Sequence, residues 1–151
     1  MNESLKQHYT IKPNCSNIMT TPNLCPCCSG IAFADCCEPI ISEKKEALTA
    51  LELMRSRYTA FTVADVDYLL RSHAAKTRPV KDRKNIERWA KLVTWMGLSI
   101  LRTEAGEAND ETGYVEFKAT FLENGQPGQI HERSLFHREN GKWVYVSGVH
   151  F

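Results

Sequence analysis

The amino-acid sequence predicts an α+β fold in which helices pack on one face of an antiparallel sheet. Apolar residues recur at helical spacing up to about residue 93, and from residue 95 onward apolar and polar residues alternate. The pair Asn140-Gly141 predicts a two-residue turn between two strands. Three helices followed by a four-stranded meander account for these observations.

The helical periodicity falls into three segments. Ser42 is a candidate N-cap for a helix over residues 43–58, in which Ala47, Leu51, Met54 and Tyr58 recur on one face. The stretch 62–65 resembles a capping box and predicts a second, short helix. Asp82 is the candidate cap of the third helix. Before them, residues 31–37 suit a single helical turn that Pro39 would end.

The second half of the chain predicts strands over residues 95–103, 113–122, 129–138 and 142–147. The clearest alternation runs through the second of them, whose apolar face would carry Val115, Phe117, Ala119 and Phe121. The run 123–128 contains asparagine, proline and two glycines, so we expect it to form the turn into the third strand.

Composition places the chain among intracellular globular proteins. With 151 residues, 42% of them hydrophobic, it can bury a core without crosslinks. The formal net charge of +1 favours neither nucleic acid nor membrane as a partner. The basic stretch 71–91 lacks the interleaved aromatic residues of a nucleic-acid groove. No apolar run is long enough for a spanning helix or a secretory signal, so we expect a cytoplasmic location.

Five of the six cysteines lie between residues 25 and 37, a density that indicates metal binding in a reducing compartment. Cys25, Cys27, Cys36 and Cys37 are candidate thiolate ligands of one structural zinc ion, since zinc takes four such ligands tetrahedrally. The Ser29 hydroxyl and backbone N–H groups are candidate donors to the sulfurs. Free thiols or a redox dithiol are the alternatives. Cys15 is interpreted as an exposed thiol outside the site.

The order Cys-Pro-Cys-Cys-Ser-Gly, a five-residue spacer and Cys-Cys resembles the SEC-C motif, which takes its name from the tail of the bacterial translocase motor SecA. The resemblance implies a zinc site and, by analogy, a protein-binding surface. Cys28 stands where the motif commonly has glycine, and it offers a fifth thiol that competes with Cys27 for the metal.

Downstream stretches at residues 57–61, 77–79, 115–119, 131–136 and 141–145 resemble the uncharacterised bacterial YchJ-like proteins. The resemblance implies a nuclear-transport-factor-2-like (NTF2-like), cystatin-like cone: a curved sheet wrapped around a pocket and closed by helices. It divides the chain into a flexible polar lead-in over residues 1–23, the zinc motif at 24–40 and the cone domain at 42–151.

Glu132 is the candidate polar residue of the cone pocket. It shares the apolar parity of its strand with Ile130, Ser134 and Phe136, which places a carboxylate on the covered face as a general base or a ligand anchor. Three helical residues are expected at the same mouth: Tyr58, Tyr68 and His73. An ion pair or a hydrogen bond with a neighbouring side chain is the alternative role for Glu132.

These observations support a cytoplasmic zinc-binding protein that acts as an interaction or adaptor module, with another protein as its partner. A small-molecule binding protein or enzyme using the pocket around Glu132 is the alternative, and no catalytic residue is assigned. A homodimer formed through the sheet is a third expectation.

Overall fold

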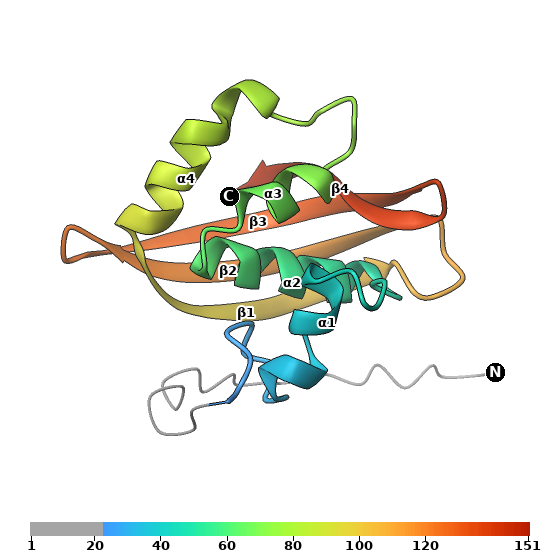
Figure 1. The fold of residues 1–151 in the computed structure, drawn as a ribbon, viewed down its shortest axis with the longest axis horizontal. Coiled ribbons are helices and arrows are strands. Elements are labelled where there is room, and N and C mark those ends of the chain that lie inside the picture. Colours follow the sequence, from blue (N-terminus) through green and yellow to red (C-terminus); the bar gives the residue numbers. More distant parts are fainter. Residues whose placement is uncertain (1–22) are drawn as a thin grey trace.

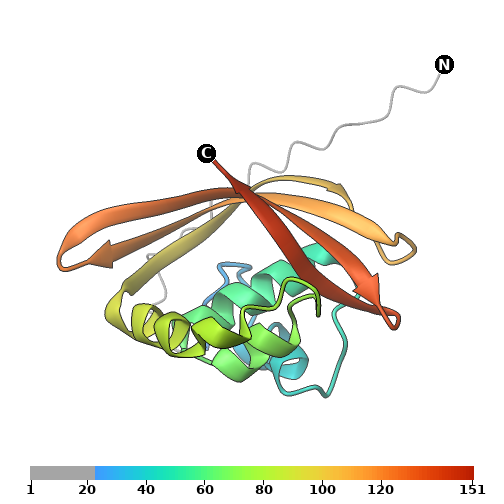
Figure 2. The same ribbon diagram turned by 90° about the horizontal axis from the view of Figure 1, so that it is seen from above.

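A four-stranded antiparallel sheet forms one layer of the molecule, and the helices form the other. The computed structural model describes residues 23–151, so Cys15 and nearly all of the lead-in lie outside it. The strands are β1 (Thr94–Ala105), β2 (Thr112–Glu123), β3 (Gln126–Glu139) and β4 (Lys142–His150), and they neighbour one another in chain order. Figure 1 shows α2 lying along the sheet, and Figure 2 shows the sheet arching over the helices. The predicted α+β class is therefore confirmed.

Two-residue turns set the register of the last three strands. Asn124 and Gly125 join β2 to β3, and Asn140 and Gly141 join β3 to β4; all four have positive φ, as this hairpin turn requires. The turn at Asn140 and Gly141 was predicted. The prediction of a longer turn over residues 123–128 is wrong, because Glu123 already pairs with Gln126. Gly128 belongs to β3, where the ring of Phe121 lies over the position that a Cβ would occupy.

The first long helix begins later than predicted. Helix α2 (Ala50–Thr62) starts after Thr49, whose hydroxyl accepts a hydrogen bond from the N–H of Glu52. Ser42 instead lies at the end of a short helix, α1 (Glu38–Ile41). Pro39 occupies the first turn of α1 rather than ending the preceding 3-10 turn, Phe33–Asp35, because its missing N–H is not needed there.

Two further helices complete the covering layer. Helix α3 (Val66–Arg71) is capped by Asp65, whose carboxylate accepts from the N–H of Tyr68; the predicted start at residue 62 is therefore three residues early. Helix α4 (Arg83–Leu92) follows Asp82 as expected, although the Asp82 side chain makes no capping bond. Among the described residues no helix has the length and apolarity needed to cross a bilayer.

The larger of two apolar clusters lies between the helices and the sheet, and the smaller comprises Ile40, Ala60, Tyr68 and Leu69. Val115, Phe117 and Ala119 of β2 are buried as predicted, and they pack with residues of α2 and with Phe136 of β3. The same cluster includes Cys25, Cys27, Cys28 and Cys37. The cysteine-bearing arm, residues 23–41, thus shares the core of the cone rather than forming one of its own.

Candidate functional site

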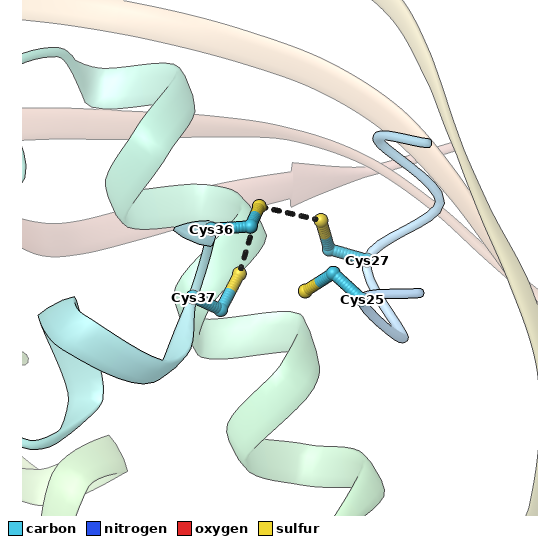
Figure 3. Close-up of side chains that lie close together, drawn as sticks. All are labelled: Cys25, Cys27, Cys36 and Cys37. Atoms are coloured by element: carbon cyan, nitrogen blue, oxygen red, sulfur yellow. Dashed lines mark hydrogen bonds between the residues drawn. The ribbon is translucent and has the colours of Figure 1, made fainter. Parts of the chain in front are cut away.

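A tight backbone loop brings the first two site cysteines together. Leu24 and Ala32 pair in an isolated antiparallel bridge, and the N–H of Cys25 donates to the carbonyl of Ile31 at 2.8 Å. Gly30, with φ of +79°, supplies the left-handed residue at which the chain reverses. The 3-10 turn that follows then returns Cys36 and Cys37 to face Cys25 and Cys27 (Figure 3).

The four sulfurs have the spacing of a tetrahedral metal site. The Sγ atoms of Cys27 and Cys36 are 3.6 Å apart and those of Cys36 and Cys37 are 3.8 Å apart, and all four lie within 4.8 Å of one another. A regular tetrahedron with metal–sulfur bonds of about 2.3 Å has sulfur–sulfur edges of about 3.8 Å. The cluster can therefore hold one metal ion.

Cys28 lies outside this cluster. Its Sγ accepts a hydrogen bond from the backbone N–H of Leu98 on β1 at 3.3 Å, which directs the sulfur toward the sheet. Its φ is +64°, in the left-handed region that glycine adopts most readily. This conformation explains why glycine suits the position in related motifs. The arrangement favours Cys27 over Cys28 as the ligand.

Hydroxyl groups approach the sulfurs from two sides. Ser29 Oγ lies 3.3 Å from Cys36 Sγ and also accepts from the N–H of Ile31. Thr59 of α2, fully buried, places its Oγ1 3.6 Å from Cys25 Sγ. The expected role of Ser29 is confirmed. A backbone donor was also expected, and the N–H of Cys27 supplies one by hydrogen-bonding to the sulfur of Cys25.

The arm is tied to α2 by a further polar contact. Arg55 donates from Nη1 to the carbonyl oxygen of Cys27 at 2.8 Å. Sequence reasoning missed both Arg55 and Thr59, because they lie 28 and 34 residues along the chain from the cysteines that they contact, and only the folded chain brings them together. Their spacing of four residues, which places them on one helical face, is the only sequence signal.

The thiols share their protons unequally. Hydrogen bonds from Cys25, Cys36 and Cys37 hold the pKa of Cys27 far below its ordinary value. Hydrogen bonds with Cys25 and Cys27 raise the pKa of both Cys36 and Cys37. The pKa of Cys25 is also lowered, to about 7, so Cys25 and Cys27 form thiolates more readily than Cys36 and Cys37, where further ionisation is opposed. A cation at the centre of the four sulfurs would remove that opposition.

A second candidate site is a cavity of about 240 Å³ between the helices and the sheet. Tyr58, His73, Glu132 and Ser134 all line it, so the structure brings four of the five predicted pocket residues together. Tyr68 is the exception. Its hydroxyl is hydrogen-bonded to Ser56, and it lines a separate groove on the other side of α3.

Glu132 is buried and well anchored. Its Oε1 accepts hydrogen bonds from Ser134 Oγ at 2.7 Å and from the Tyr145 hydroxyl at 2.9 Å. Its Oε2 lies 3.4 Å from Nε2 of the exposed His150. The predicted burial of Glu132 is confirmed. Its hydrogen bonds to Ser134 and Tyr145 also match the alternative role, in which the carboxylate pairs with neighbouring side chains.

A buried arginine lies at the same end of the cavity. Arg57 donates from Nη1 to the carbonyl of Leu69 and to the hydroxyl of Ser72, and its guanidinium lies 4.7 Å from the centre of the Tyr145 ring. Burial lowers the pKa of Arg57 to about 10, so it stays protonated at neutral pH. Burial, together with the positive charges of Arg57 and Arg78, lowers the pKa of His73 to about 4.

Arg57 and Tyr145, which line the cavity, and His150, which contacts Glu132, were not predicted. Helical periodicity does not distinguish the buried Arg57 from Arg55, the half-buried arginine of the same helix. Tyr145 lies at the irregularity where β3 and β4 change register, so strict alternation does not place it. His150 was missed because the last strand extends three residues beyond its predicted end.

A curved sheet covered by helices, joined to a four-cysteine arm, defines an NTF2-like domain preceded by a SEC-C motif. The family model of the middle NTF2-like domain of YchJ matches residues 49–148, and that of the SEC-C motif matches residues 22–39. The chain therefore belongs to the YchJ-like family of bacterial proteins.

Relatives and solved structures agree with this assignment. A UPF0225 protein of Photorhabdus laumondii is 46% identical over 128 residues, which are 83% of this chain and 80% of the relative. The UPF0225 protein YchJ of Shigella dysenteriae is 38% identical over 83% of this chain and 82% of its own length. The solution structure of a SEC-C motif containing protein from Rhodopseudomonas palustris superposes with a TM-score of 0.75 at 31% identity, covering 83% of this chain and 96% of that one.

Proposed function

We propose that the chain is a zinc-binding protein in which one zinc ion per chain has a structural role. The mutual spacing of the four sulfurs carries this proposal. Four thiolates fill a tetrahedral shell and leave no open position for a substrate, which is the pattern of structural rather than catalytic zinc. Iron can also occupy four thiolates, but a site of given ligands binds zinc more tightly than ferrous iron.

Metal analysis of three forms tests this proposal. The purified protein should contain about one zinc per chain, and Cys25→Ser should lose it because three thiolates leave the shell incomplete. Cys28→Gly is the matched control and should keep its zinc, since Cys28 lies outside the cluster and its φ suits glycine. Loss of zinc in Cys28→Gly with retention in Cys25→Ser would sink the ligand assignment.

The arm, held in place by the metal, is proposed to serve as an interaction module for another cytoplasmic protein. Its resemblance to the SecA tail motivates this role. Ile31, at the tip of the cysteine loop, is half exposed (50%) although it is a large apolar residue. An exposed apolar side chain on a rigid loop suits a protein contact.

Affinity capture with matched variants tests the interaction role. Protein partners recovered by the zinc-loaded chain should be lost with Ile31→Asp, which keeps every cysteine, and with Cys25→Ser. Val63→Asp, at another exposed apolar residue directly after α2, should recover them as the unaltered chain does. Equal recovery by all four proteins would rule out the arm as the interaction surface.

A second candidate function, small-molecule binding, is favoured by the cavity beside Glu132. Its volume of about 240 Å³ is several times that of one water molecule, and its polar residues converge from α2, β3 and β4. The chain would then bind a ligand in the cone while zinc holds the arm. No step of catalysis is assigned to it.

A further inference from the structure

The cavity has an aromatic end and a polar end. At the aromatic end Trp95 makes edge or tilted ring contacts with Tyr58, Phe61 and Trp89, at centroid distances between 5.3 and 5.8 Å. At the polar end Tyr145 contacts Arg57, His73 and Glu132. A ligand that fills both ends needs a flat apolar body with one polar group.

The polar end contains one negative and one positive side chain in balance. Glu132 supplies the carboxylate, which accepts from the Tyr145 hydroxyl, and Arg57 supplies the guanidinium, which lies over the Tyr145 ring. His73 contributes no charge at neutral pH, because burial lowers its pKa. Burial also raises the pKa of Tyr145, which stays a neutral phenol. A ligand with a net charge would meet one attractive and one repulsive partner.

Both charged groups retain unused hydrogen-bonding capacity. Oε1 of Glu132 accepts two bonds, whereas within residues 23–151 the only polar neighbour recorded for Oε2 is the solvent-exposed His150. Arg57 donates from Nη1 alone, and within the described chain its Nε and Nη2 have no recorded acceptor. The cavity thus offers an acceptor and a set of donors at the same end.

We propose that the cavity binds a small molecule of zero net charge, with a single aromatic ring as its body and a polar group that both accepts and donates hydrogen bonds. A primary carboxamide has this chemistry: its oxygen accepts from Arg57 and its NH₂ donates to Glu132. The inference rests on the second proposed function and specifies the ligand class for that site. The volume of the cavity suits one substituted ring rather than a cofactor.

Three probes of equal shape test the charge requirement. Benzamide, benzoate and benzamidine share one ring and differ mainly in charge. Each is titrated into ¹⁵N-labelled protein while the three indole N–H signals are followed. Benzamide should bind at least about tenfold more tightly than either ion, since a charged probe leaves one buried charge opposed. The signals of Trp89 and Trp95 should shift, whereas that of Trp143, outside the cavity, should not.

A charge-removing variant sharpens the test. Glu132→Gln leaves Arg57 as the only charge at the polar end. The variant should therefore bind benzoate more tightly, relative to the other two probes, than the unaltered protein does. Glu116→Gln is the matched control. It removes a carboxylate from the outer face of β2, where Glu116 is bonded to His131, and should bind as the unaltered protein does. An unchanged indole spectrum verifies that each variant is folded.

The outcomes separate the ligand class from the site. If benzoate or benzamidine binds as tightly as benzamide, the cavity is a small-molecule site but the uncharged class is wrong. If none of the three shifts the indole signals of Trp89 or Trp95 at millimolar concentration, small-molecule binding in the cavity is itself overturned. Zinc content is unaffected by either result.

Discussion

At the scale of single residues, hydroxyl groups on two different elements orient the site cysteines. Ser29 belongs to the motif, but Thr59 belongs to α2 and is fully buried. Groups that hydrogen-bond to metal ligands fix their orientation and raise metal affinity. The Thr59 hydroxyl also couples the site to the helix on which the cone cavity is built.

Replacing Thr59 with valine, which keeps its shape, should weaken zinc binding by about tenfold, because Cys25 Sγ loses its nearest hydroxyl. Competition with a chromophoric chelator measures the change. Thr62→Val is the control: its hydroxyl, also on α2, donates to the carbonyl of Thr59 and touches no cysteine. Equal affinities for the two variants would show that the Thr59 contact has no role at the metal.

His73 predicts a pH dependence of folding. Its pKa is about 4 in the folded protein and about 6.5 as an unperturbed imidazole, so between these values the unfolded chain binds a proton that the native chain does not. The free energy of unfolding should therefore fall as the pH drops from 6.5 toward 4. Denaturant titrations of the protein and of His73→Gln should show a stability difference that shrinks over this window. A difference independent of pH would contradict the account.

At the scale of elements, the extension of β4 covers the buried carboxylate. Gly148 lies across from Ser134, and a Cβ at this position would overlap the Glu132 side chain. The strand had been expected to end at residue 147. A glycine in a sequence usually indicates that a strand ends or is irregular. Here Gly148 continues the strand and leaves room for the Glu132 side chain.

Gly148→Ala should lower the free energy of unfolding by about 1–3 kcal/mol, because Glu132 must move away from Ser134 and Tyr145. The loss should be smaller when Glu132 is also replaced by alanine, since the overlapping atoms are then gone. Ser147→Ala, at an exposed neighbour, should change little. Urea unfolding of the four variants gives the coupling, and identical losses in both backgrounds would refute the packing argument.

The sequence predicted the presence of the helices and strands better than it predicted the residues at which they begin and end. Alternation identified all four strands, since a sheet with one covered face imposes a period of two. The start of α2 was placed at residue 43 rather than 50 because both Ser42 and Thr49 are residues that can cap a helix, and only the fold selects Thr49. The four cysteines and Glu132 were identifiable for chemical reasons. Arg57, Thr59 and His150 were not, because their roles depend on contacts between distant segments.

At the scale of the whole molecule, the metal is expected to order the arm rather than the cone. The sheet and helices pack around Val115, Phe136 and Trp143. The arm contributes its cysteines to the same core, but its own backbone bonds close only short loops and turns. Without the metal, four thiols would have to pack there alone.

Removing zinc with a chelator should therefore raise hydrogen-exchange rates in the arm and leave β2 and β3 protected. The N–H groups of Cys25 and Phe33, bonded within the cysteine loop, are the most direct reporters. Exchange followed by mass spectrometry resolves the two regions. Loss of protection throughout the sheet would mean that the metal stabilises the entire fold. Unchanged protection of the arm would mean that the metal orders neither the arm nor the sheet.

X-ray absorption at the zinc edge measures directly which atoms coordinate the metal. The account predicts four sulfur atoms at about 2.3 Å and no nitrogen or oxygen in the shell. The spectrum should be the same for Cys28→Gly. A shell with an oxygen or nitrogen ligand, or protein purified without zinc, would contradict a closed site formed by Cys25, Cys27, Cys36 and Cys37.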